Sequence, residues 1–336
     1  MGSWYCEQSN ENPLVISTRI RLARNLSDIP FPSRMNEEQR KDLCHRVEKA
    51  VSESNSPFSK SLKFIDMKDV PENERFAMVE RHVVSHGFVA DNRTRALILS
   101  DDESISIMVG EEDHLRIQVL LPGLQLEKAY DIAEQLDTLL GDQLHFAFDD
   151  RLGFLTECPT NLGTGLRASV MLHLPVMESR GEIAALADSV GKIGFTVRGL
   201  YGEGTKAAAS LYQISNQITL GISEKNALDN LKIITTQLVE KEQQEQKTLN
   251  RLQMEDLCMR AYGVLQNARM MSSEEMMKLL SRIQLGQRMG ILNSPVSPIQ
   301  LLVEGQPYML MRRFGQMGAD ERDLYRANMI RDKFGS

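Results

Sequence analysis

Residues 156–169 bring together a thiol, a glycine-rich turn and a cation that could act on an anionic ligand. Pro159 follows Cys158 and restrains the backbone next to the thiol. The turn Gly163-Thr164-Gly165 lets successive backbone N–H groups approach a ligand closely, which favours anion binding. Arg167 opens an apolar run that is typical of a strand. We expect an anion-binding loop here, although a Gly-x-Gly sequence alone also fits an ordinary loop before a strand.

A second cationic segment lies near the N-terminus, where Ser17, Arg19 and Arg21 alternate along the chain. On a strand, side chains two residues apart project from the same face. Planar guanidinium groups bind phosphate oxygens in pairs, so two arginines and a hydroxyl on one face suit a polyphosphate. A solvated amphipathic segment is the alternative interpretation.

Residues 110–116 hold the acidic counterpart of these arginines. The segment contains, in order, Glu111, Glu112, Asp113, His114 and Arg116. Adjacent carboxylates repel one another, so a fold seldom constrains them unless cations or a substrate compensate. An exposed acidic hairpin is the alternative. Glu203 lies in a second glycine-rich turn, residues 198–205, which Arg198 opens.

Together these residue types suit phosphoryl transfer from a polyphosphate to a guanidinium group. Phosphoryl transfer is catalysed mainly by positioning and by neutralising charge on the transferring group, which calls for arginines. A guanidinium is protonated at neutral pH and must lose a proton before its nitrogen can attack. Two carboxylates can hold the planar group, and one of them can act as general base.

The length, net charge and cysteine content limit the class of protein that can carry these groups. A chain of 336 residues can form one large domain or two smaller ones. A net charge of −7 argues against nonspecific nucleic-acid binding. We expect no membrane span, because no run of about 18 apolar residues occurs. The N-terminus lacks the features of a signal peptide, and the four cysteines form no disulfide framework, so we expect a cytoplasmic protein.

The sequence pattern predicts both helices and strands before about residue 248, and helices alone after it. Expected helices cover 36–53, 126–140 and 178–190, with a long charged helix from 223. Expected strands cover 76–84, 96–100, 104–109, 114–121, 195–197 and 211–220, and residues 54–75 are polar and turn-rich. The methionine-rich stretch 253–290 is more typical of core and dimer contacts than of a cofactor site. We expect an α+β catalytic domain over 1–247 and an all-α domain over 248–336.

Four motifs in order resemble the ATP:guanido phosphotransferases, the family of creatine and arginine kinases, over roughly residues 14–247. They are Ser-Thr-Arg-Ile-Arg, Glu-Glu-Asp-His-Leu-Arg, Cys-Pro-Thr-Asn-Leu-Gly-Thr-Gly-Leu-Arg and Val-Arg-Gly-Leu-Tyr-Gly-Glu-Gly. Within the family the chain is most similar to the bacterial protein-arginine kinases. The resemblance implies an antiparallel β-sheet core flanked by helices, the fold of phosphagen kinases and glutamine synthetase, with ATP and Mg²⁺ bound across the sheet.

The resemblance also implies residue roles in ATP binding. Residues at phosphate-binding and glycine-loop positions are Ser17, Arg19, Arg21, Arg116, Arg167, Arg198, Gly163, Thr164, Gly165, Gly202 and Gly204. His82 falls where a histidine packs near the adenosine; without the family it would be a structural strand histidine. The chain supplies no metal ligands, since the nucleotide phosphates hold Mg²⁺.

Catalytic roles follow in the same way. Glu112 matches the general base, with Glu111 and Asp113 beside it, and Glu203 matches a second carboxylate that binds the guanidinium. Cys158 matches a reactive cysteine whose thiolate orients the guanidino group without a covalent intermediate. Three positions depart from the family: Gly110 replaces an asparagine, residues 85–87 lack a proline, and Thr219 stands where metabolite kinases have an arginine.

Two features favour protein arginine over a small guanidine as acceptor. The first phosphate motif begins at residue 17, which leaves no room for the N-terminal helical domain that encloses small substrates in metabolite kinases. Near the C-terminus, a helical segment resembles a phosphoarginine-binding element. Its residues are Arg322, Asp323, Arg326 and Ala327. The two arginines are four apart and share a helix face. A salt-bridged surface helix is the alternative for this segment.

The resemblance implies a kinase that marks proteins for Clp-type degradation and regulates the stress response. Expected partners are protein substrates that include a CtsR-type repressor, an McsA-type zinc-finger activator, a ClpC-type unfoldase and a second copy of the chain, with no nucleic acid and no membrane. A kinase for free arginine or another small guanidine is the alternative. A catalytically inactive phosphoarginine-binding adaptor is a third hypothesis, which the complete set of arginines and carboxylates disfavours.

Overall fold

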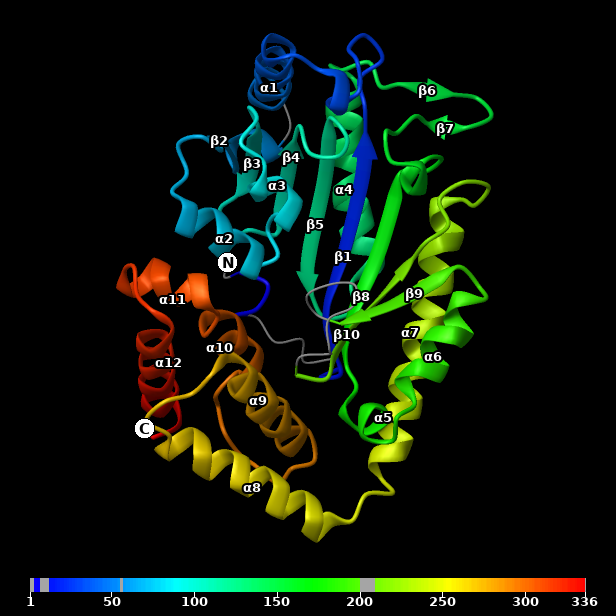
Figure 1. Cartoon of the computed structure of the whole chain (residues 1–336). Coiled ribbons are helices and arrows are strands. Elements are labelled where there is room, and N and C mark those ends of the chain that lie inside the picture. The colour runs from blue at the N-terminus through cyan, green and yellow to red at the C-terminus, as the bar shows by residue number, and fades with distance from the viewer. Residues whose placement is uncertain (1–2, 7–11, 55–56, 200–208, 336) are drawn as a thin grey trace. The chain divides into compact units, whose positions relative to one another are not determined.

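The structure is a computed structural model that describes residues 3–6, 12–54, 57–199 and 209–335 (Figure 1). In this part of the chain, eight strands form one sheet in the order β2-β3-β4-β5-β1-β8-β10-β9. Their bounds are β1 (Val15–Arg24), β2 (Leu62–Asp66), β3 (Ala96–Ser100), β4 (Ile105–Val109), β5 (Leu115–Pro122), β8 (Leu166–His173), β9 (Phe195–Gly199) and β10 (Leu211–Asn216). A separate hairpin consists of β6 (Phe148–Asp149) and β7 (Gly153–Phe154). The pairs β2–β3, β3–β4, β4–β5 and β5–β1 are antiparallel.

Helices connect and cover these strands. Those before residue 248 are α1 (Glu37–Ser52), α2 (Glu72–Glu80), α3 (His86–Ala90), α4 (Leu126–Gly141), α5 (Pro175–Ser179), α6 (Ile183–Gly191) and α7 (Glu224–Gln246). The later ones are α8 (Arg251–Asn267), α9 (Ser273–Arg288), α10 (Pro298–Glu304), α11 (Pro307–Phe314) and α12 (Ala319–Phe334). The described residues beyond 248 contain helices and no strand, as the sequence predicted.

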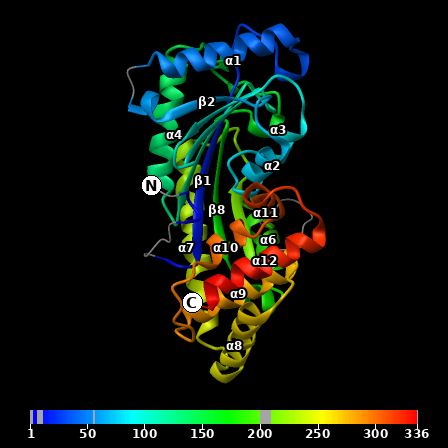
Figure 2. The same cartoon turned by 90° about the vertical axis from the view of Figure 1, so that its left-hand side faces the viewer.

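The chain divides into two compact units. The first comprises Met1–Trp4, Ser17–Val170 and Ser215–Ile233, and the second comprises Tyr5–Ile16, Met171–Ile214 and Ile234–Ser336. In the first unit, α4 lies on one face of the sheet, against β5, while α2 and α3 lie on the other (Figure 2). A core of buried apolar residues, among them Val83, Phe88, Leu97 and Met108, joins α2 and α3 to β3 and β4. Two hydrophobic interfaces therefore hold the sheet of this unit in place.

The second unit contains β9 and most of β10, and its helices after residue 248 pack pairwise, α8 on α9 and α12, α9 on α10, and α11 on α12. Its interior contains a polar network. His173 contacts Ser281 through Nε2 at 2.9 Å and Arg288 through Nδ1 at 3.0 Å. Glu242, fully buried, accepts the N–H groups of Val176 and Met177, which begin α5. Burial lowers the pKa of His173 well below its usual value, so this histidine stays neutral.

Most elements expected from periodicity are confirmed. α1 begins with a capping box in which Asn36 accepts the N–H of Gln39 and Gln39 accepts that of Asn36. The strands β3, β4 and β5 and the helices α4 and α7 also lie within a residue or two of their expected bounds. Apolar residues at helical spacing in α1 and α4, and short apolar runs in β3 and β4, explain why these elements could be predicted.

The strand expected over 76–84 is wrong, because these residues form the end of α2 and a turn. Pro71 precedes the helix, and Glu72 and Glu74 lie in its first turn, where carboxylates stabilise a helix N-terminus. His82 follows with a φ of 61° and is a turn residue rather than a strand residue.

Three other boundaries differ from expectation. β2 lies within the stretch expected to be turn-rich. The helix expected over 178–190 is two helices, separated at Gly181, whose φ of 73° suits glycine. β10 ends at Asn216 rather than 220, because the Asn216 side chain bonds the Ala168 N–H and the carbonyls of Leu166 and Ile218.

Candidate active site

Three arginines of the predicted phosphate-binding set project from one face of the sheet. In the β1–β5 register, Arg21 lies opposite Gln118, and Ala23 lies opposite Arg116. Residues opposite one another in an antiparallel pair share a face, and Arg19 and Arg21 are two residues apart. The expectation that this segment is a strand with both arginines on one face is confirmed. Ser17 is on the same strand and is buried.

The arginines repel one another electrostatically. Burial, followed by the charges of Arg116 and Arg167, lowers the pKa of Arg19 to about 10. The pKa of Arg21 is lowered well below its ordinary value, first by burial and then by its three arginine neighbours, with Glu111 opposing. The buried Nε of Arg21 has no hydrogen-bond partner among the described residues. Crowded cations that neighbouring carboxylates compensate only in part form a site that is stabilised by a multiply charged anion.

The three adjacent carboxylates occupy three different environments. Glu111 is buried, and its Oε2 lies 2.5 Å from Nη1 of Arg116. Asp113 is 2% exposed. The Glu112 side chain is 45% exposed, and its Oε2 lies 3.7 Å from Nη2 of Arg116. Glu112 is therefore the carboxylate of the three that an incoming guanidinium can reach beside the arginine cluster.

Asp113 fixes the carboxylate loop to its surroundings. Its Oδ1 accepts from the Asn25 side chain at 2.7 Å and from the Glu157 N–H at 2.8 Å, and its Oδ2 accepts from Asn161 at 3.1 Å. Burial raises the pKa of Asp113, and these hydrogen bonds oppose the rise. Because Asn161 belongs to the 3₁₀ turn Pro159–Asn161 that follows Cys158, Asp113 ties the thiol loop to the loop that carries Glu112.

His114 is structural rather than catalytic. Its Nδ1 accepts the N–H of Leu26 at 2.9 Å, so its Nε2 carries the proton and donates to Pro30 O at 2.8 Å. Burial lowers the pKa of His114 to about 4. The neutral ring thus stabilises the turn that follows β1.

Cys158 is half-buried and lies at the start of the 3₁₀ turn. Its Sγ is 3.1 Å from Oγ1 of Thr160, and its carbonyl accepts from Thr156 at 2.8 Å. The glycine turn that follows has a packing role. A Cβ on Gly163 would overlap the carbonyl of Thr219, and one on Gly165 would lie 2.6 Å from Ala23 O.

Thr164 and Thr219 are hydrogen-bonded in the same loop region. The Thr164 N–H donates to Thr219 O at 3.0 Å, and the Thr219 hydroxyl lies 2.7 Å from Leu162 O. Where metabolite kinases have an arginine, Thr219 thus holds the loop backbone by hydrogen bonds.

Gly110 has a φ of 80°, a conformation that both glycine and asparagine adopt, so the change from asparagine at this position preserves the turn.

His82 lies over the arginine face. Its carbonyl accepts from Nε2 of Gln118 at 2.9 Å, and its ring meets Trp4 edge to face with 5.7 Å between ring centroids. Burial and the charge of Arg19 lower the pKa of His82 to about 3, so the ring is neutral. A neutral aromatic ring beside the phosphate-binding arginines is suited to packing against a nucleoside.

Of the remaining predicted residues, one belongs to the second unit and three lie outside the described residues. Arg198 is on β9, in the second unit. Glu203, Gly202 and Gly204 lie outside the described residues. Within the described residues, no group of three His, Cys, Asp or Glu side chains could hold a metal ion, and no helix is long and apolar enough to cross a membrane.

The predicted phosphoarginine residues lie on α12, which confirms the helix. Arg326 is 1% exposed and donates to Gly305 O and Met271 O, each at 2.7 Å, and to Asp323 at 2.5 Å. Ala327 is fully buried, and Arg322 is half-buried. Arg326 therefore joins helices within the second unit and orients Asp323.

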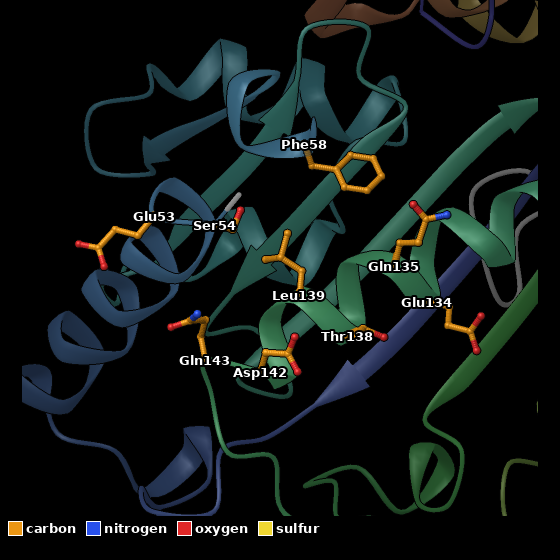
Figure 3. Close-up of a pocket in the computed structure, with 9 residues that line it drawn as sticks. All are labelled: Glu53, Ser54, Phe58, Glu134, Gln135, Thr138, Leu139, Asp142 and Gln143. Atoms are coloured by element: carbon orange, nitrogen blue, oxygen red, sulfur yellow. The ribbon is translucent and has the colours of Figure 1, made fainter. Parts of the chain in front are cut away.

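A pocket of about 400 Å³ adjoins the glycine loop and is lined by Gly163, Thr164, Thr219 and the β6–β7 hairpin. A larger pocket of about 600 Å³ lies between the end of α1 and the outer side of α4 (Figure 3). Glu53, Glu134 and Asp142 are among the residues that line the larger pocket. Their negative charge disfavours a nucleotide, so the arginine face is the better phosphate site.

Four supporting residues were not predicted from the sequence. Asn25 and Asn161 hold Asp113, Ser85 bonds Glu111, and Gln118 holds the His82 turn. They are ordinary polar residues, and their roles arise from contacts between segments far apart in the chain. Asn25 directly follows the arginine-rich segment and Asn161 lies within the third motif, so these two positions gave a local signal.

Comparison with known proteins identifies the family and supports the fold. Residues 42–245 match the family ATP:guanido phosphotransferase, C-terminal catalytic domain, and residues 251–336 match the protein-arginine kinase McsB C-terminal domain. Among solved structures, a duplicated taurocyamine kinase from Schistosoma mansoni shares the fold, with a TM-score of 0.63 and 24% identity over 79% of this chain and 41% of that longer one. Lombricine kinase has a TM-score of 0.62 and 22% identity over 71% of this chain and 70% of its own.

Curated relatives match almost the whole chain. The protein-arginine kinase of Symbiobacterium thermophilum is 45% identical over 96% of this chain and 94% of its own length. That of Caldanaerobacter subterraneus subsp. tengcongensis is 43% identical over 95% and 96%, respectively. The chain belongs to the ATP:guanido phosphotransferase family and, within it, to the protein-arginine kinases.

Proposed function

We propose that this protein transfers the γ-phosphoryl group of ATP to arginine side chains of proteins. The observation that carries the proposal is the arrangement of Arg19, Arg21 and Arg116 on one sheet face, with the exposed Glu112 carboxylate 3.7 Å from Arg116. The cations can neutralise a triphosphate, and the carboxylate can receive the proton of an incoming guanidinium.

In this mechanism, Arg19, Arg21, Arg116 and Arg167 bind the phosphates on the sheet face. His82 packs beside the adenosine. Ser17, Arg198 and the glycine loops with Gly163, Thr164, Gly165, Gly202 and Gly204 complete the ATP site. Mg²⁺, bound by the nucleotide phosphates, would neutralise charge on the transferring group.

Carboxylates hold the acceptor, the guanidinium group of a protein arginine. Glu112 removes the guanidinium proton as the nitrogen attacks phosphorus and the bond to ADP breaks. Glu203 clamps the same guanidinium, and Cys158 orients it. Glu111 and Asp113 hold the loop in place, as their buried contacts support.

Protein arginine rather than a free guanidine is the acceptor, as the names of the full-length relatives support. We propose that residues 1–247 form the catalytic domain and that 248–336 form a domain for dimerisation and phosphoarginine binding. There Arg322 and Asp323 meet the ligand, and Arg326 and Ala327 shape the site. A CtsR-type repressor among the substrates, an McsA-type activator, a ClpC-type unfoldase and a cytoplasmic location complete the proposal.

Incubation of the protein with ATP and Mg²⁺ and either casein or free arginine tests the function. We expect acid-labile phosphate on casein and none on the free amino acid. Label on free arginine alone would establish the small-guanidine alternative. No label in either reaction, with and without an activator, would leave only a binding protein.

A further inference from the structure

Ser85 lies between α2 and α3 and contacts the carboxylate loop. Its Oγ donates to Oε1 of Glu111 and accepts the N–H of Phe88 at 3.0 Å. A hydroxyl has a single proton to donate, and the Phe88 N–H already occupies an acceptor position. The Ser85 proton is therefore directed at the Glu111 carboxylate.

Glu111, held by Ser85, in turn contacts the arginine cluster. Its second oxygen, Oε2, pairs with Nη1 of Arg116, and the Glu111 side chain is only 8% exposed. Glu111 is also the carboxylate that partly offsets the repulsion acting on Arg21. A buried carboxylate held on both oxygens fixes the guanidinium that it contacts, because little rotamer freedom remains.

The segment that contains Ser85 is tied to the sheet at other points as well. Gln118 donates to His82 O at 2.9 Å, and Ser106 donates to Val83 O at 2.8 Å. His82 is the proposed adenosine contact. The Ser85–Glu111 bond therefore joins the adenosine side of the site to its phosphate side.

We propose that Ser85 is a positioning residue for phosphoryl transfer, whose hydroxyl orients Glu111 and thereby holds Arg116 toward the triphosphate. This proposal rests on the proposed function. It gives the neighbouring carboxylates separate roles: Glu111 orients an arginine, and Glu112 accepts a proton.

The variants Ser85→Gly and Ser85→Thr separate positioning from folding. Ser85 is also the N-cap of α3, and glycine is a nearly equivalent N-cap, whereas threonine keeps the hydroxyl. We expect Ser85→Gly to lower kcat/KM for ATP roughly tenfold, the effect of one hydrogen bond to a charged group. Ser85→Thr should restore most of the activity.

A double-mutant cycle with Glu111→Gln supplies a readout that a purely structural role would not change. Ser85→Gly should have little further effect in the Glu111→Gln background, because the hydroxyl acts through that carboxylate. Wild-type kcat/KM in Ser85→Gly, or fully additive effects in the cycle, would overturn the proposal.

Equilibrium binding of a fluorescent ATP analogue keeps this test distinct from the test of function. If the wild-type protein labels no arginine, the proposed function fails, and Ser85 is judged by nucleotide affinity alone. Ser85→Gly must then weaken binding of the analogue roughly tenfold. Unchanged affinity would refute the positioning role in that case too.

Discussion

The arginines of β1 and β5 and the arginine of α12 show how the same side chain serves two purposes. Arg21 lies among other arginines, has a lowered pKa and has a buried Nε with no partner among the described residues. Arg326 is 1% exposed, and its guanidinium meets two main-chain carbonyls and a carboxylate. Incompletely compensated charge around Arg21 is a cost to the fold that a ligand can relieve, whereas Arg326 has its partners without a ligand.

The substitution Arg21→Ala should have the largest effect of those that test this contrast, and the effect is on catalysis. We expect kcat/KM to fall by at least about a thousandfold, the low end for losing an arginine that stabilises a transferring phosphoryl group. The unfolding temperature should stay level or rise, since a poorly compensated charge is removed. Initial rates and thermal unfolding measure both. Arg251→Ala on α8, where the arginine is exposed, is the matched control. Activity within tenfold of wild type would break the comparison.

Glu112→Gln tests the acidic half of the site. Turnover should drop at least about a hundredfold, because the amide cannot accept the guanidinium proton. The control is Glu134→Gln, which removes a carboxylate that lines the pocket on α4 (Figure 3). Its turnover should match the wild type. Near-normal rates in Glu112→Gln would remove this residue from the role of base.

Arg326→Met tests the structural half of the comparison. We expect a loss of about 3 kcal/mol in the free energy of unfolding, because two carbonyls and Asp323 lose a buried partner. Arg322→Met should cost less than about 0.5 kcal/mol, as is usual for a substitution outside the core. Urea unfolding measures both. Equal stabilities of the two variants would contradict a structural role for Arg326.

The smallest expected effect is the contribution of His114 to the pH dependence of the free energy of unfolding. The folded protein binds a proton on His114 only near pH 4, whereas an unfolded histidine binds one near 6.5. The unfolded state takes up more protons in this window, so stability falls as the pH falls from about 6.5 to about 4. Between pH 7 and 5 this residue should contribute roughly 2 kcal/mol of that loss. Urea unfolding of His114→Gln should show a correspondingly shallower pH dependence. If stability depended on pH as steeply in His114→Gln as in the wild type, the lowered pKa of His114 would be refuted.

The sequence alone established the motifs, their order and the regular elements with strong periodicity. The alternation of Ser17, Arg19 and Arg21 predicted a strand with one charged face, and β1 confirms it. The helix start at Asn36 was equally readable from its capping residues. Such signals are local, because strand alternation and helix capping depend on residues within a few positions of one another.

Tertiary structure decided which member of each charged set is buried and which is exposed. Nothing in the run Glu111-Glu112-Asp113 distinguishes the three carboxylates, yet the fold pairs the first with Ser85 and Arg116 and the third with Asn25 and Asn161. Glu112 alone of the three remains exposed. Burial and partners come from segments up to 88 residues away, as in the Asn25–Asp113 bond. Side-chain roles of this kind depend on long-range packing, which local pattern cannot encode.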